Sequence, residues 1–210
     1  MKLAIIGSGN IGKSIGDWAA KVNYEVIFAA KNEQRALEAA RLAGHNAKSA
    51  NVQTAVELAD MILLAVPYNA VKEVLSDIGP LLKGKVLIDA TNALNADFSG
   101  LMLGFTTSAA EEIAKLAPEA LVVKAFNTVF AHLYASQNPK IKGNTISVFY
   151  AGDDDGAKAK VAELITKMGF DAVDAGLLKA ARNLEPLAFL NISLGYGLGH
   201  GPEIGFSFIR

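Results

Sequence analysis

The chain alternates short apolar runs with amphipathic segments along most of its length. After its first residue the run at 60–66 contains no polar side chain, which is typical of a strand buried on both faces of a sheet. Runs that are largely apolar predict strands over residues 2–6, 25–30, 60–66, 86–90, 121–126 and 145–150, and two shorter, more polar segments predict strands over 46–49 and 171–174.

The segments between these runs have helical spacing. Val71, Val74, Leu75 and Ile78 recur at helical intervals and predict a helix over 69–78. The predicted helices cover 13–20, the 31–35 segment to about 42, 52–58, 69–78, 107–116 with Thr107 or Ser108 as N-cap, 157–168, and 177–198 with Pro186 inside.

This alternation predicts an α/β fold. We expect a Rossmann-type, mainly parallel sheet with right-handed crossovers, helices on both faces and a small C-terminal α/β extension. A loop around 136–139 precedes the extension. We therefore expect a dinucleotide-binding Rossmann domain over 1–136, and an extension over 137–210 that caps the ligand cleft and is continuous with the first domain.

A glycine-rich turn joins the first predicted strand to the first helix. Gly7, Gly9 and Gly12 have the Gly-x-Gly-x-x-Gly spacing of the dinucleotide-binding fingerprint. Gly7 permits a tight turn, Gly9 leaves room for a pyrophosphate, and Gly12 lets the helix approach the strand. The helix N-terminus then offers free N–H groups to the phosphates. The alternative is a βα turn with no ligand.

The end of the second predicted strand bears on which nicotinamide cofactor fits. An NAD site commonly has a carboxylate there, whereas this chain has none before Glu33. Lys31 and Arg35 would attract a 2′-phosphate, and Asn32 lies between them. The pattern favours NADP(H), mainly because the acid is missing; Lys31 and Arg35 on their own fit solvated charges at a helix start better than a phosphate site.

Small and polar residues follow the next predicted strands, at the edge where open α/β sheets bind ligands. Ala65, Val66 and Pro67 would form a flat apolar wall for a nicotinamide or ribose. Asn92 follows the fifth strand, where turn and cap chemistry is the alternative role. Asn127 follows the sixth strand and is placed to hold a carboxamide.

Composition narrows the classes of function. The 210 residues are 51% hydrophobic and 20% charged with a net charge of −1, which gives no reason to expect nucleic acid as a partner. There is no cysteine and there are only three histidines, so we expect no metal site. We see no signal segment or membrane span and expect a cytoplasmic location without membrane association.

Five motifs occur in order along essentially the whole chain. They are Gly7-Ser8-Gly9-Asn10-Ile11-Gly12, Leu64-Ala65-Val66-Pro67, Ile88-Asp89-Ala90-Thr91-Asn92, Val123-Lys124-Ala125-Phe126-Asn127-Thr128 and Asn183-Leu184-Glu185-Pro186-Leu187-Ala188. Together they resemble the F420-dependent NADP oxidoreductase family, which is similar to the cytoplasmic domains of six-transmembrane ferric reductases.

The resemblance implies that NADPH binds across the glycine loop, with F420, FMN or FAD as a second substrate stacked on the nicotinamide. Ser8, Asn10 and Ile11 would contact phosphates. Lys31 would stand where the family usually has Arg for the 2′-phosphate. The 65–67 segment, with Asn92 and Asn127, would line the nicotinamide pocket. The partners implied are a small-molecule redox acceptor and a second copy of the chain in a homodimer.

Direct hydride transfer requires mainly that the protein position the two reacting rings. We therefore expect no evident catalytic residue. His132 is a candidate proton donor, with a surface histidine as the favoured alternative, and Glu185 is expected to be a paired structural carboxylate.

Two other functions stay open at this stage. An imine or β-hydroxyacid reductase begins in the same way but needs a large helical second domain. A non-catalytic regulator that senses NADP(H) needs a partner surface. Reduction of F420, FMN or FAD by NADPH would distinguish the three.

Overall fold

The computed structural model describes residues 1–210 and contains an eight-stranded sheet in the order β10-β9-β6-β5-β4-β1-β2-β3. Neighbouring strands are parallel except β6 and β9, which pair antiparallel. The predicted Rossmann-type fold is confirmed. The strands of this sheet are β1 (Lys2–Ile6), β2 (Glu25–Ala29), β3 (Lys48–Ser49), β4 (Met61–Leu64), β5 (Val86–Asp89), β6 (Leu121–Lys124), β9 (Ser147–Gly152) and β10 (Asp171–Asp174).

Helices cover both faces of the sheet because successive strand residues point to opposite sides. Leu3 and Ile5 of β1 pack in one hydrophobic cluster with α1, α2 and α7, whereas Ala4 and Ile6 pack in a second cluster with α3, α4 and α5. The helices are α1 (Asn10–Lys21), α2 (Glu33–Ala43), α3 (Val52–Leu58), α4 (Val71–Ile78), α5 (Ala109–Leu116), α6 (Ala131–Ser136), α7 (Asp155–Lys167) and α8 (Ala181–Ile192).

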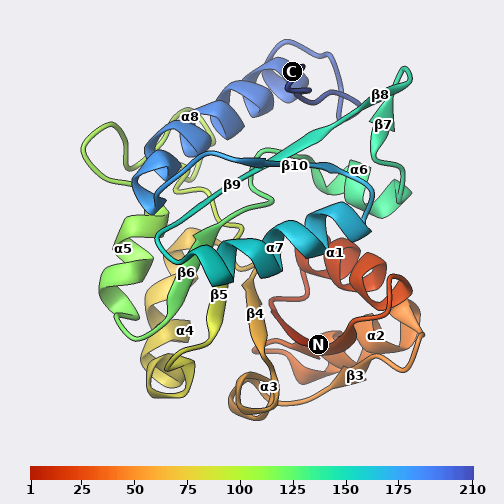
Figure 1. Cartoon of the computed structure of the whole chain (residues 1–210), viewed down its shortest axis with the longest axis vertical. Helices are drawn as coiled ribbons and strands as arrows, with labels where there is room; N and C mark the ends of the chain where they lie inside the picture. Colours follow the sequence, from red (N-terminus) through yellow and green to blue (C-terminus); the bar gives the residue numbers. More distant parts are fainter.

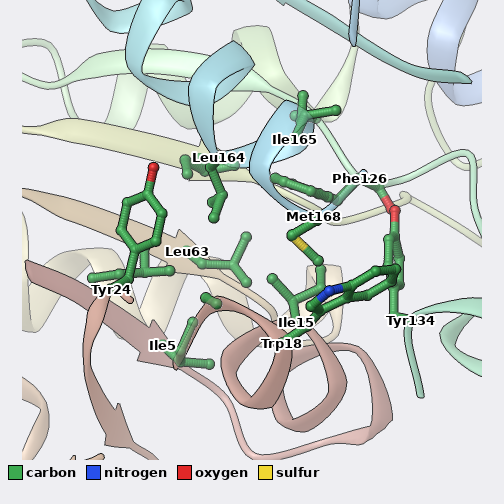
Figure 2. Packing of buried hydrophobic residues seen from close by; sticks show 14 of the residues in the cluster. Ile5, Ile15, Trp18, Tyr24, Leu63, Phe126, Tyr134, Leu164, Ile165 and Met168 are labelled. Carbon is green, nitrogen blue, oxygen red and sulfur yellow. The ribbon is translucent and has the colours of Figure 1, made fainter. Parts of the chain in front are cut away.

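The first cluster forms the larger part of the core. Figure 2 shows Ile15 and Trp18 of α1 facing Leu164 and Met168 of the α7 segment, with Leu63 of the sheet beside them. Segments from the beginning and the later part of the chain therefore share one hydrophobic interior.

Helix α8 lies beyond the carboxyl ends of the central strands. In Figure 1 it lies at the opposite end of the molecule from α3, which precedes β4. This position puts α8 next to the edge where ligands bind in open α/β sheets.

The predicted helix over 177–198 is wrong as a single element. It is divided into a 3₁₀ turn over Leu178–Ala180 (η3), the helix α8, and a π turn over Ser193–Gly197 (η4). Pro186 lies inside α8. The π turn coincides with Gly195, where an added Cβ would lie 2.8 Å from the Phe130 ring. Close packing against Phe130 therefore explains this glycine.

Smaller corrections concern the region after β6. The sequence shows no helix over 131–136, where α6 lies, and no strands at β7 (Lys140–Ile141) and β8 (Asn144–Thr145), which pair antiparallel. The strand expected over 145–150 is β9, shifted by two residues. These elements are short, so they have little hydrophobic periodicity to reveal them.

The C-terminal tail contacts the sheet at β9 and β10. The N–H of Ser147 in β9 donates to the Phe206 carbonyl at 2.8 Å, and the guanidinium of Arg210 pairs with Asp171 of β10. No helix is long and apolar enough to span a membrane.

Candidate functional site

A cleft of about 790 Å³ lies over the carboxyl ends of β1, β4, β5 and β6. Its walls come from the glycine loop, from the segments that follow β4, β5 and β6, and from one side of α8 and η4. None of the 22 lining residues is charged, and 14 are hydrophobic. The lining residues are 9–11, 65–68, 90–92, 94, 98, 126–131, 188, 191–192 and 196.

The structure brings together one group of the residues predicted from the sequence and leaves another outside. Those that line the cleft are Gly9, Asn10, Ile11, Ala65, Val66, Pro67, Asn92 and Asn127. Those outside its lining are Gly7, Ser8, Gly12, Lys31, Asn32, Arg35 and His132.

The glycine loop has the shape that a pyrophosphate requires. Gly7 has φ +114°, and a Cβ there would lie 2.4 Å from the Ala65 carbonyl oxygen. A Cβ on Gly12 would lie 2.0 Å from the Gly7 carbonyl oxygen, whereas a Cβ on Gly9 would meet no atom within 4 Å. Gly7 and Gly12 are therefore needed for the fold, and Gly9 leaves an open space.

Helix α1 presents its N-terminus to that space. It begins at Asn10, three residues earlier than expected, and its N-cap Gly9 provides no side-chain hydrogen bond. No acidic residue lies in the first turn. The N–H groups of Asn10 and Ile11 are among the first of a helix, which have no partner within the helix. The helix N-terminus therefore suits an anion such as a phosphate group.

The residues expected near a 2′-phosphate lie outside the cleft, after β2. Lys31 Nζ is 2.8 Å from Glu73 Oε1 of α4, and both side chains are exposed. Glu73 raises the pKa of Lys31 through its hydrogen bond and its charge. Asn32 is the N-cap of α2, and its side chain accepts from the Arg35 N–H at 3.1 Å. The sequence near Lys31 contains no carboxylate before Glu33, but the fold brings the carboxylate of Glu73 next to Lys31.

Two asparagine side chains interlock at the cleft. Asn92 Nδ2 donates to the Asn127 carbonyl, and Asn127 Nδ2 donates to Asn92 Oδ1, both at 3.1 Å. Asn127 Nδ2 also donates to the Leu184 carbonyl at 3.1 Å. This pair joins the ends of β5 and β6 to α8, so the geometry of Asn127 is fixed by three elements.

Three buried polar atoms, one in this pair and two in neighbouring threonines, have no hydrogen-bond partner. They are Asn127 Oδ1 and the hydroxyl oxygens of Thr91 and Thr128, all from residues that line the cleft. Buried polar atoms are ordinarily hydrogen-bonded. An amide oxygen and two hydroxyls match the donors and acceptors of a carboxamide group, so a nicotinamide fits the cleft at this place.

The backbone at the end of β6 has an uncommon conformation. Phe126 has φ +66°, in the left-handed region that non-glycine residues rarely adopt. The Tyr134 hydroxyl donates to the Phe126 carbonyl at 3.1 Å and holds this turn. The Phe126 side chain is buried beside Tyr134 (Figure 2), so the turn directs Asn127 toward the cleft while the Phe126 ring anchors in the core.

A buried ion triad lies behind the cleft. Lys124 Nζ is 2.9 Å from Asp89 Oδ2 and 3.0 Å from Glu185 Oε1, and all three side chains are at most 1% exposed. Burial would lower the pKa of Lys124, but the two carboxylates outweigh that effect and hold it above its ordinary value. Glu185 also accepts from the N–H groups of Ala109 and Ala110 at the start of α5.

The triad confirms the prediction that Glu185 is a paired structural carboxylate. Its partner Lys124 is the residue that sequence reasoning missed. The signal was present, because Lys124 is a lysine inside the apolar run 121–126 of a central strand. A lysine at such a position must be buried and paired.

Aromatic side chains contribute to the walls of the cleft. Phe130 and Tyr196 pack edge to face with ring centroids 5.1 Å apart, and Tyr68 and Phe98 also line the space. Burial raises the pKa of Tyr68, with a further rise from the negative charges of Glu112, Glu185 and Asp89 that Lys124 partly offsets. Walls of this kind suit a planar ring.

The candidate proton donor lies away from this space. His132 Nε2 is 3.4 Å from Glu203 Oε1, and the His132 side chain is 48% exposed. No group of three or more His, Cys, Asp or Glu side chains is placed to hold a metal ion. The cleft therefore contains groups that bind and orient, with no charged side chain at its surface.

Comparisons with known proteins identify related sequences and a related structure. The family model described as NADP oxidoreductase, coenzyme F420-dependent, matches residues 2–93. The F420-dependent NADP reductase of Methanothermobacter thermautotrophicus is 30% identical over 209 residues, which cover 92% of this chain and 89% of that protein. The crystal structure of a proposed F420-dependent NADP reductase from Arthrobacter sp. FB24 superposes with a TM-score of 0.88 at 28% identity, covering both chains completely.

A second group of relatives is longer. Metalloreductase STEAP3 of Rattus norvegicus is 31% identical over 186 residues, which cover 89% of this chain and 36% of that protein. The chain thus spans about a third of the length of the metalloreductases that it matches. Because the similarity to the F420-dependent reductase extends over nearly all of both proteins, the chain belongs to the F420-dependent NADP oxidoreductase family.

Proposed function

We propose that this protein transfers hydride between NADP(H) and a deazaflavin of the F420 type, with FMN or FAD as the other acceptors to be tested. The observation that supports this most is a continuous uncharged cleft from the glycine loop to the aromatic residues beside α8. One end offers N–H groups for a pyrophosphate, the floor offers an amide for a nicotinamide, and the wall offers flat apolar surface for a second ring.

The residues would act by binding and orientation. The N–H groups of Asn10 and Ile11 would hold the pyrophosphate, and Lys31 would leave Glu73 to meet the 2′-phosphate. Asn127 Oδ1 would accept from the nicotinamide carboxamide, with its side chain held by Asn92 and the Leu184 carbonyl.

The two bound rings supply the chemistry, since a hydride moves from the reduced nicotinamide to the acceptor ring. The apolar walls at Val66, Pro67 and Phe130 would exclude water from the space between the rings. Transfer of this kind requires positioning more than acid–base catalysis, which agrees with a cleft lining free of charged side chains.

The test is oxidation of NADPH by the purified protein with F420, FMN, FAD or a ferric chelate as the acceptor. The reaction is measured as the loss of NADPH absorbance. We expect turnover with F420 or a flavin. Tight binding of NADPH with no transfer to any of these acceptors would refute the proposal and favour a regulator that senses NADP(H). Turnover of cyclic imines instead would favour the imine reductase alternative.

We also propose that the protein forms a homodimer through its C-terminal apolar surface. Leu190, Tyr196 and Leu198 are 49%, 65% and 71% exposed on α8 and the segment that follows it. Light scattering on the wild type and on the Leu198→Asp variant tests this proposal. We expect the wild type to have the mass of a dimer and the variant to have the mass of a monomer. A wild-type mass of one chain would contradict the proposal.

A further inference from the structure

The buried triad of Asp89, Lys124 and Glu185 has a net charge, and the proposed function gives that charge no role. Asp89 accepts from Lys124 and from the Thr91 N–H, and Glu185 accepts from Lys124 and two N–H groups of α5. These surroundings offer only donors, which satisfy carboxylates in their ionised form. One ammonium and two carboxylates leave a net charge of −1 with no exposure to water.

We propose that this buried negative charge makes the cleft bind the positively charged nicotinamide ring of NADP⁺ in preference to the neutral ring of NADPH, so that the triad favours hydride donation. The inference rests on the proposed function, because it assumes that the nicotinamide lies at Asn92 and Asn127. It assigns to Asp89, Lys124 and Glu185 a role in setting the relative affinity for two oxidation states, beyond their role in packing.

The triad is separated from the cleft by a single layer of residues. Lys124 Nζ donates to the Thr91 carbonyl, and Thr91 lines the cleft. On the other side, Asn127 donates to the carbonyl of Leu184, the residue before Glu185. The carboxylates therefore lie directly behind the residues that would hold the nicotinamide.

Nothing in the cleft lining opposes this charge, because none of its residues is charged. The α5 N-terminus, which faces Glu185, contributes a partial positive charge of about half a unit, and this offsets the triad only in part. The sum of charges behind the cleft is therefore negative. Tyr68 on the cleft wall lies within reach of these charges: burial raises its pKa, and Glu112, Glu185 and Asp89 raise it further, while Lys124 partly offsets them.

The physical consequence follows from the charge of the two ring forms. When the reduced nicotinamide gives up a hydride, two electrons and one proton pass to the deazaflavin or flavin, and the nicotinamide ring becomes a cation. A negative charge nearby stabilises that cation and leaves the affinity for the neutral ring almost unchanged. Two unit charges about 10 Å apart at an effective dielectric constant of about 20 change an equilibrium constant by roughly tenfold.

The experiment compares dissociation constants of NADP⁺ and NADPH, measured by calorimetry without an acceptor. Glu185→Gln removes one negative charge and keeps an oxygen that accepts from the Ala109 or Ala110 N–H. Asp89→Asn removes the other charge and keeps an acceptor for the Thr91 N–H. In both variants we expect NADP⁺ binding to weaken about tenfold relative to NADPH binding. A general structural disturbance of the cleft would weaken both ligands and leave the ratio of their dissociation constants unchanged.

Glu111→Gln is the matched control. Glu111 lies on α5 and pairs with Arg182 of α8 at 2.6 Å, so it joins the same two helices without belonging to the triad. We expect its ratio of dissociation constants to equal that of wild type.

The possible outcomes separate the hypotheses. An unchanged ratio in a folded Glu185→Gln protein, or equal weakening of both ligands, would overturn the inference and leave the triad a structural role alone. If Glu185→Gln fails to fold in a thermal melt, the same two outcomes in Asp89→Asn decide the matter. If the wild type binds neither NADP⁺ nor NADPH, the proposed function itself fails.

Discussion

Replacing Gly9 by valine separates ligand binding from folding at the glycine loop. Gly9 has φ −76° and ψ −177°, an extended conformation that any residue adopts. A Cβ there would meet no protein atom within 4 Å. The fold should therefore tolerate the change, with a loss of about 1 kcal/mol because glycine is preferred to valine at an N-cap.

The effect on binding should be much larger. A valine side chain would occupy the space that we assign to the pyrophosphate and would separate it from the first N–H groups of α1. Hydrogen bonds to a charged group contribute about 1.5–3 kcal/mol each. Loss of two such bonds weakens NADPH binding by at least about 100-fold.

The assay is calorimetric titration with NADPH, together with a thermal melt of each protein. Gly104→Val is the matched control, because a Cβ on Gly104 also meets no atom within 4 Å and Gly104 lies outside the cleft lining. We expect the control to bind NADPH like the wild type. If Gly9→Val melts normally and binds NADPH within about threefold of wild type, the glycine loop is not the pyrophosphate site.

Two further predictions concern charged side chains. Lys31→Ala should weaken NADPH binding about tenfold more than NADH binding, because only NADPH has the 2′-phosphate; an equal effect on both in titrations would contradict the assignment. The guanidinium of Arg182 holds the pKa of Glu111 below its ordinary value of 4.5, so this pair stabilises the folded state above that pH and the contribution is lost as pH falls further. The free energy of unfolding in urea should therefore fall less between about pH 5 and pH 3 in Glu111→Gln than in wild type, and identical slopes would show that the pair contributes nothing.

The sequence predicts the sheet well because burial leaves a direct pattern. The central strand β4 is completely buried, and its uninterrupted apolar run reflects that. The start of α5 could also be predicted from the sequence, because serine is a common N-cap residue and the Ser108 side chain accepts from the Glu111 N–H. Strong local chemistry of this kind identifies an element without knowledge of its neighbours.

Contacts between distant segments were harder to predict. Lys124, Asp89 and Glu185 lie on β6, β5 and α8, and local spacing does not reveal which side chains meet across three elements. Lys31 and Glu73 are separated by 42 residues and meet only because α4 packs near the end of β2. The sequence could indicate that Lys124 needs a partner, whereas the fold determines which partner it has.

The helix predicted over 177–198 was wrong for a different reason. The pattern from 177 to 198 has helical spacing, yet a π turn replaces the α-helix from Ser193 to Gly197. Glycine weakens the α-helix at that point, and Gly195 is required by the close approach of Phe130. Tertiary packing thus overrides the local periodicity.

The most direct test of the central claim is transfer of an isotopic label. NADPH with deuterium in place of both hydrogens on the hydride-bearing carbon of its nicotinamide ring is mixed with the protein and oxidised F420 in ordinary water, and the reduced deazaflavin is analysed by mass spectrometry. Direct hydride transfer in the cleft predicts that the deuterium appears on the carbon of the reduced deazaflavin ring. A reduced product containing only solvent hydrogen would contradict the account, as would the absence of any reduction of F420, FMN and FAD by NADPH.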